Sequence, residues 1–198
     1  MPVKRQISAR HGVYFITFTC YRWKYLLSLT NAYDLIYFWF DHLKNQGHYI
    51  IGYVIMPNHI HILIAFRDTG QSINIIVGNG KRFIAYGIIK RLREQENPLL
   101  SALAEAVKNI DKKRNKKHEV WERSFDWKEC RSDQFIQQKL NYMHQNPCKG
   151  KWALAASPVE YPHSSLLYYS TGEQGIYPVF NYQQVADVNL TEWVVTNR

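Results

Sequence analysis

The sequence predicts an α+β fold, a split β-α-β antiparallel sheet with helices packed on one face. Strand-like runs rich in β-branched and aromatic residues alternate with stretches whose apolar residues recur at helical spacing. Their order along the chain is β-α-β-β-α-β followed by a helix, which is typical of this class. With 198 residues and no Gly/Ser/Pro-rich linker, the chain is expected to form a single domain over residues 1–198.

The first half of the chain supplies three strands and one helix. Residues 13–19 read as a strand because they are mostly β-branched or aromatic. Residues 32–43 carry apolar side chains at the spacing of a helix packed on one face. Residues 49–56 and 59–66 form two apolar runs separated by only two residues, which predicts an antiparallel hairpin.

The second half is less regular. A helix is expected over 73–96, although its three glycines weaken it. Residues 99–117 are predicted as a short helix and a mobile loop, and residues 119–125 as the last strand. Ser132 and Asp133 open a third helix, which Pro147 stops. The core then covers residues 12–169, and residues 170–198 read as a C-terminal tail.

Composition narrows the class of partner. The chain is 46% hydrophobic and 21% charged, which excludes a disordered or low-complexity protein. It holds 25 Lys and Arg against 16 Asp and Glu, a net charge of +9, and is 15% aromatic. Positive charge with many rings suits single-stranded nucleic acid, where phosphates meet charge and bases stack on rings. An aromatic core beneath a solvated basic surface explains the same composition equally well.

The cysteines and apolar runs point to a cytoplasmic protein. The three cysteines are far apart and form no CxxC pair, which fits a reducing compartment rather than a disulfide framework. No apolar run is long enough to span a bilayer, so no membrane association is expected.

Two histidines interrupt the apolar run at 59–66. Side chains alternate along a strand, so His59 and His61 share one face, about 7 Å apart, and can reach one metal ion. A pair of surface or hydrogen-bonded histidines is the alternative. Imidazoles in an otherwise apolar strand would be costly without a partner, which favours the metal.

The third predicted helix presents a second polar set. Tyr142 and Asn146 are four residues apart and share a face, with Lys139 one turn before the tyrosine. The apolar residues of this helix form a different face, suited to packing on the sheet. A tyrosine wedged at the edge of the core is the alternative for Tyr142, and the proline after Asn146 disfavours helical geometry there.

These motifs resemble the HUH single-tyrosine transposases, and in particular their REP-associated tyrosine transposase branch. The resemblance covers most of the chain, about residues 12–169. Five stretches carry it in the family's order: Tyr53-Val54-Ile55-Met56-Pro57-Asn58-His59-Ile60-His61-Ile62-Leu63, Lys81-Arg82-Phe83, Val120-Trp121-Glu122-Arg123-Ser124-Phe125, Tyr142-Met143-His144-Gln145-Asn146-Pro147 and Tyr161-Pro162-His163-Ser164-Ser165.

The resemblance implies a ferredoxin-like fold and a metal-dependent DNA transposase and endonuclease. Tyr142 would attack the scissile phosphate to give a 5′-phosphotyrosine and a free 3′-hydroxyl, and a second strand's 3′-hydroxyl would reverse the step. His59, His61 and Asn146 would hold a divalent ion, Mg²⁺ or Mn²⁺. The partner would be single-stranded or hairpin DNA, with no nucleotide cofactor, and the protein would act as a monomer or homodimer.

One position departs from part of the family. In the insertion-sequence branch, the corresponding helix is similar to this one but has glutamine four residues after the tyrosine, where this chain has Asn146. REP-associated members are similar to this chain in having asparagine there, so the departure indicates that branch. Residues 97–117 read as an insertion or a divergent loop.

Several basic residues are candidate phosphate contacts. Lys81, Arg82 and Lys139 are candidates for phosphate contacts, although a solvated helix face is favoured for any one of them taken alone. The run at 112–117 is favoured as a DNA-contacting loop over plain surface charge. Its basic residues are Lys112, Lys113, Arg114, Lys116 and Lys117.

Two other functions compete with the transposase. A non-catalytic single-strand binder on the same sheet could use Tyr142 for stacking, but it has no need of the two histidines. A water-using nuclease would need carboxylates beside the histidines, and the nearest in sequence is Asp68.

Overall fold

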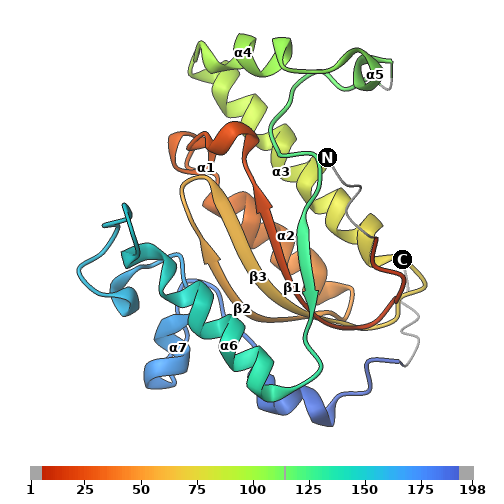
Figure 1. Ribbon diagram of the computed structural model, residues 1–198, viewed down its shortest axis with the longest axis vertical. Coiled ribbons are helices and arrows are strands. Elements are labelled where there is room, and N and C mark those ends of the chain that lie inside the picture. The colour runs from red at the N-terminus through yellow and green to blue at the C-terminus, as the bar shows by residue number, and fades with distance from the viewer. Residues whose placement is uncertain (1–5, 114, 192–198) are drawn as a thin grey trace.

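The computed structural model describes residues 6–113 and 115–191 of the chain, and a four-stranded antiparallel sheet forms its centre (Figure 1). The strand order is β2-β3-β1-β4. The strands are β1 (Gly12–Thr19), β2 (Tyr49–Ile55), β3 (His59–Phe66) and β4 (Asp126–Glu129). The predicted α+β class, the first strand and the β2–β3 hairpin are confirmed.

The last strand was predicted at the wrong place. Residues 119–125 carry the apolar pattern, but Val120 and Trp121 are buried in the core, and Trp121 forms an isolated bridge with Cys20 instead of a strand. β4 follows this segment and pairs with residues 14–17 of β1. It is a polar edge strand with one apolar residue, Trp127, so alternation in the sequence does not reveal it.

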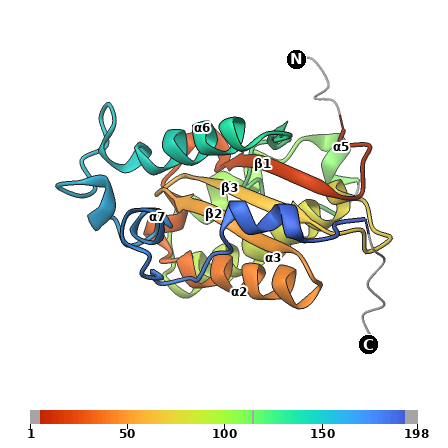
Figure 2. The ribbon, with the colours of Figure 1, turned by 90° about the horizontal axis from the view of Figure 1, so that it is seen from below.

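Helices cover both faces of the sheet. α2 (Tyr33–Asn45) and α3 (Ile73–Glu94) pack on one face, as predicted, whereas α6 (Asp133–His144) lies on the other (Figure 2). The strands are apolar on both sides, since Ile16 of β1 belongs to the α2–α3 core and Phe15 to the α6 core. The apolar side chains on both faces of the sheet must therefore be buried, and a single layer of helices can bury only one face.

Short elements complete the chain. α4 and α5 follow α3 and project beyond one end of the sheet (Figure 1). The short elements are η1 (Tyr21–Trp23), α1 (Leu26–Leu29), α4 (Leu99–Glu105), α5 (Asn109–Lys112), η2 (Asn146–Cys148), η3 (Pro158–Glu160), α7 (Leu166–Thr171) and η4 (Tyr182–Asp187). None of the described helices is long and apolar enough to cross a bilayer.

The predicted tail lies against the body of the protein as far as residue 191. Tyr177 is buried in the α2–α3 core, and the Tyr53 hydroxyl donates to its carbonyl oxygen at 3.3 Å. Tyr182 and Val185 are buried in the α6 core. This segment therefore extends the packing of both layers.

Two glycines of α3 provide a matched test of helix packing. A Cβ on Gly80 would lie 2.2 Å from Trp39 Cε2 of α2, whereas nothing lies within 4 Å of a Cβ on Gly78. We expect Gly80→Ala to lower the free energy of unfolding by about 1–3 kcal/mol because α3 must shift. Gly78→Ala should raise it by up to about 1 kcal/mol, since alanine is the better helix former. Denaturant titration measures the free energy of unfolding of both variants. A change of the same sign in both would contradict the close packing of Gly80 against Trp39.

Candidate active site

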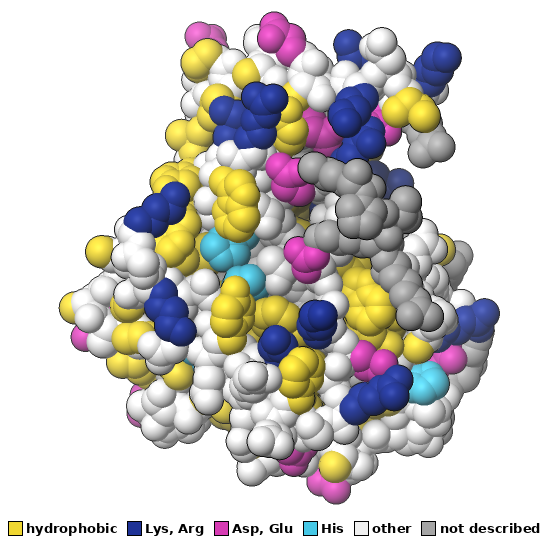
Figure 3. Space-filling model, in the orientation of Figure 1, with side chains coloured by type: hydrophobic (Ala, Val, Ile, Leu, Met, Phe, Trp, Pro, Cys, Tyr) yellow, Lys and Arg dark blue, Asp and Glu magenta, His cyan; other side chains and the backbone are white. Residues whose placement is uncertain are grey.

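The site lies on the α6 face of the sheet, around the two histidines of β3. His59 and His61 point to the same side as Leu63 and Ala65, which pack under α6. Each is 5% exposed, and their ring centroids are 4.8 Å apart. Histidine surface is visible near the centre of this face, over β3, with hydrophobic side chains on both sides (Figure 3). The predicted shared face is confirmed.

Hydrogen bonds orient both imidazoles. His59 Nδ1 lies 2.7 Å from Asn58 Oδ1, and His61 Nδ1 lies 2.6 Å from Thr17 Oγ1. An amide oxygen only accepts, so Nδ1 of His59 carries the proton and Nε2 keeps its lone pair; the Thr17 hydroxyl can impose the same tautomer on His61. Hydrogen-bond partners of this kind typically orient metal-binding histidines.

The environment keeps both rings neutral. Burial lowers the pKa of His59 to about 4. Burial, together with His59 and the positive charge of Lys139, lowers the pKa of His61 to about 3. Neutral imidazoles are the form that binds metal ions, so the pair is ready for a ligand at neutral pH.

α6 brings Tyr142 to the histidines. The helix begins with the Ser132 side chain accepting from Phe135 N, and it packs on the sheet through Ile136, Leu140 and Met143. Gly52 of β2 allows the close approach, because a Cβ there would lie 2.5 Å from Leu140 Cδ2.

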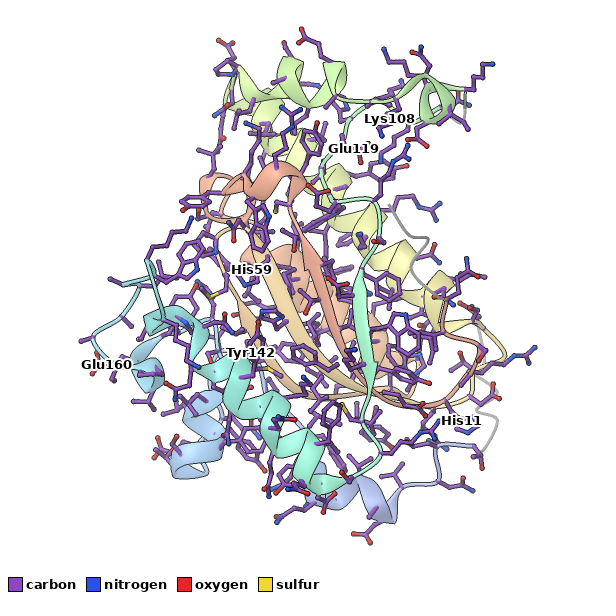
Figure 4. All side chains as sticks on the ribbon, viewed as in Figure 1. His11, His59, Lys108, Glu119, Tyr142 and Glu160 are labelled. Atoms are coloured by element: carbon purple, nitrogen blue, oxygen red, sulfur yellow. The ribbon has the colours of Figure 1, made fainter. Side chains whose placement is uncertain are left out.

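The Tyr142 ring meets His61 and Phe15 edge to face, at centroid distances of 5.3 and 6.1 Å. The residue is 49% exposed, so its hydroxyl can meet a ligand from solvent. Figure 4 shows Tyr142 on α6 beside the strand that carries His59.

Asn146 and Lys139 flank the tyrosine. Asn146 follows the end of α6, and its Nδ2 donates to the Tyr142 carbonyl oxygen at 2.8 Å. Its Oδ1 accepts no hydrogen bond from the described residues, so this oxygen can serve as a ligand atom. Lys139 Nζ lies over the rings of Phe135, Phe15 and Tyr142, at 4.8, 5.5 and 5.9 Å from their centroids.

Most of the other predicted basic residues gather elsewhere, in a groove of about 1030 Å³ between α3 and residues 115–127. Four of them line it, and sequence reasoning missed three more. The basic lining residues are Lys81, Arg82, Lys116 and Lys117, with Lys90, Arg93 and Arg123 in addition. Among the described residues, Glu122 is the one acid in the lining. We call this surface the basic groove.

Only part of the predicted basic run lies in the basic groove. Lys116 and Lys117 line the basic groove, whereas Lys112 and Lys113 are exposed outside its lining, and Arg114 lies outside the described residues. Lys81 is tied into the fold, because its Nζ donates to the carbonyl oxygens of Glu122 and Ser124 at 3.1 and 3.4 Å. Burial also lowers the pKa of Lys81 to about 8.

Among the comparisons with known proteins, only the comparison with solved structures finds a match. No family model and no curated protein matches the chain. Among solved structures, the chain is similar to a REP-associated tyrosine transposase bound to a REP hairpin. That match has a TM-score of 0.58 at 16% identity and covers 98% of this chain and 99% of that one. This chain has the fold of a REP-associated tyrosine transposase.

This match covers nearly the whole chain and confirms the fold that the resemblance implied. A putative transposase from Deinococcus radiodurans R1 is also similar, with a TM-score of 0.32 and 14% identity, over 73% of this chain and 97% of that one.

Proposed function

We propose that the protein is a single-strand DNA transposase and endonuclease that cleaves and rejoins DNA at hairpin sites through a 5′-phosphotyrosine. The observation that carries the proposal is the position of Tyr142 beside the two histidines. Its ring is half exposed, and the ring centroid lies 5.3 Å from that of His61. Both histidines are neutral, and their Nε2 atoms are available to a ligand. These groups come from β3 and α6, about 80 residues apart in the chain.

The donor set fits a divalent metal that also binds phosphate. His59 and His61 would supply two nitrogens, and Asn146 Oδ1 is the proposed third ligand. Among the described residues, no third His, Cys, Asp or Glu joins the pair. Such a set leaves positions for phosphate oxygens and water, as Mg²⁺ and Mn²⁺ prefer, and the two imidazoles favour Mn²⁺ in vitro. When bound, the ion would stabilise negative charge that develops on the scissile phosphate.

In the proposed cleavage, Tyr142 Oη attacks the phosphorus and loses its proton. A phosphorus–oxygen bond forms to Tyr142, the bond to the 3′ oxygen breaks, and the released 3′-oxygen takes up a proton. In strand transfer, a second 3′-hydroxyl attacks the phosphotyrosine and restores the tyrosine. The number of phosphodiester-type bonds is unchanged in each step, so no ATP is required.

The basic groove is the proposed path of the DNA backbone. Arg82, Tyr86, Lys90 and Arg93 lie on one stripe of α3, since they recur at the spacing of helix turns, and all line the groove. Lys117 and Arg123 line the opposite side. Clustered cations with an exposed ring between them suit a polyanion with stacking bases.

Neutralising the groove should change the salt dependence of DNA binding. We expect Lys90→Gln/Arg93→Gln/Lys117→Gln to flatten the slope of log K against log salt by about 0.7 for each lost contact on a single strand. The matched control is Arg10→Gln/Lys44→Gln/Lys108→Gln, which removes the same charge from exposed residues outside the groove lining. Fluorescence anisotropy at several salt concentrations measures both slopes. Equal slopes in the two triple variants would show that only net charge matters.

The second candidate function is a non-catalytic single-strand binder, favoured by the same groove and by the exposed Tyr142 ring. A binder predicts DNA affinity without a covalent product. Incubation with single-stranded hairpin DNA and Mn²⁺, followed by a denaturing gel, separates the two functions: a transposase leaves a protein–DNA adduct.

A further inference from the structure

Two short segments that combine basic and aromatic residues meet beside the histidines. The first is Arg22-Trp23-Lys24-Tyr25 and the second is Lys149-Gly150-Lys151-Trp152, and neither contains an acidic residue. The Tyr25 and Trp152 ring centroids are 5.4 Å apart. Trp23 and Trp152 lie 5.6 and 6.3 Å from His59. The two segments therefore form one surface next to His59, which we call the aromatic platform.

Two of the three rings of the platform are exposed to solvent, and Trp152 is partly buried. Trp23 is 59% exposed and Tyr25 is also exposed, although both are large apolar side chains. Exposed apolar surface of this kind, contiguous and next to a polar site, is typical of a binding surface. Lys151 Nζ lies 5.5 Å from the centroid of the Trp152 ring, which places a positive charge against the platform.

The Trp23 turn is held in a conformation that side chains rarely adopt. Arg22 and Trp23 have φ values of 50° and 57°, in the left-handed region. Contacts fix the turn on two sides: Arg22 N donates to Glu122 Oε1 at 2.8 Å, and Asn58 Nδ2 donates to the Trp23 carbonyl oxygen at 3.0 Å. Such conformations persist where the surrounding structure holds them, often at ligand-binding sites.

Asn58 connects the platform to the candidate active site. The same amide that donates to the Trp23 carbonyl through Nδ2 accepts from His59 Nδ1 through Oδ1. One side chain thus sets both the Trp23 turn and the orientation of a proposed metal ligand. These two hydrogen bonds hold the Trp23 turn next to His59.

We propose that the aromatic platform stacks unpaired nucleobases next to the scissile phosphate. Trp23 and Trp152 would supply the stacking faces, and Arg22, Lys24, Lys149 and Lys151 would bind the adjoining phosphates. The occupant is single-stranded DNA, because only unpaired bases offer a free face to a side chain and because the four charged side chains of the two segments are all positive. This inference rests on the proposed function for the identity of the ligand.

The test is the affinity for an unstructured single strand, measured by fluorescence anisotropy without metal so that no cleavage occurs. Trp23→Ala and Trp152→Ala should each weaken binding by about 5- to 150-fold, which corresponds to one lost base stack. Trp23→Phe and Trp152→Phe should keep most of the affinity because they retain a ring. Phe38→Ala is the matched control, since Phe38 is 62% exposed on α2, outside the platform.

Unchanged affinity in both alanine variants would overturn the platform, and so would equal losses in the Phe and Ala variants. Abasic sites placed along the strand add a second readout. They should weaken binding to the wild type and have less effect on the alanine variants, whereas equal effects on both would argue against stacking. A wild-type protein that binds in this pattern but forms no adduct would refute the proposed function and leave the platform standing.

Discussion

Tyr142→Phe should abolish the covalent protein–DNA adduct while leaving DNA affinity within about twofold of the wild type. The variant keeps the ring that packs edge to face on His61 and Phe15, and it loses only the nucleophilic oxygen. Adduct formation is measured on denaturing gels with labelled single-stranded hairpin DNA and Mn²⁺, and affinity by anisotropy. The loss of adduct should be complete, because the phenylalanine side chain has no oxygen that can form the bond to phosphorus.

The matched control is Tyr168→Phe, which removes a hydroxyl from a tyrosine of α7 that packs against the α2–α3 core on the other face of the sheet. It should form the adduct at the wild-type rate. An adduct that persists in Tyr142→Phe would assign the attack to another residue. A large loss of affinity in this variant would instead indicate that the hydroxyl contributes to DNA binding.

His59→Ala and His61→Ala should each remove measurable Mn²⁺ binding and eliminate the adduct. Each substitution takes away one of the two nitrogens that share the face of β3, and the described residues offer no third His, Cys, Asp or Glu in their place. Isothermal titration calorimetry with Mn²⁺ measures the first effect and the gel assay the second. DNA affinity in the absence of metal should stay close to that of the wild type.

His42→Ala on the exposed side of α2 is the matched histidine control and should bind Mn²⁺ as the wild type does. Because His61 is buried, thermal unfolding must confirm that each variant is folded. Wild-type Mn²⁺ affinity in both folded variants would remove the metal site from the account.

The sequence predicted the elements whose apolar periodicity is strong. The two-residue period of β3 placed His59 and His61 on one face, and the helical spacing of Ile136, Leu140 and Met143 placed Tyr142 off the packing face of α6. It failed at β4, where a polar edge strand has little apolar pattern to read. It also put all helices on one face, because periodicity does not say to which side of a sheet a helix returns.

The parts of the site that depend on tertiary pairing were not predictable in the same way. Thr17 reaches His61 only because β1 and β3 pair in that register, and Thr17 is one of many threonines. The contact of Asn58 with His59 could have been predicted from the sequence, because the two residues are adjacent and an asparagine side chain can hydrogen-bond to an imidazole. The combination of basic and aromatic residues in 22–25 and 149–152 was a readable signal for the platform, but their meeting at His59 required the fold.

The central claim is that Tyr142 becomes covalently linked to DNA, and its most direct test is to map the adduct itself. Wild-type protein is incubated with single-stranded hairpin DNA and Mn²⁺, digested with protease and nuclease, and analysed by mass spectrometry. The account predicts a peptide that contains Tyr142 joined to the 5′-phosphate of the downstream fragment, with a free 3′-hydroxyl on the upstream fragment. Cleaved DNA without any linked peptide, or DNA bound and left intact, would contradict it.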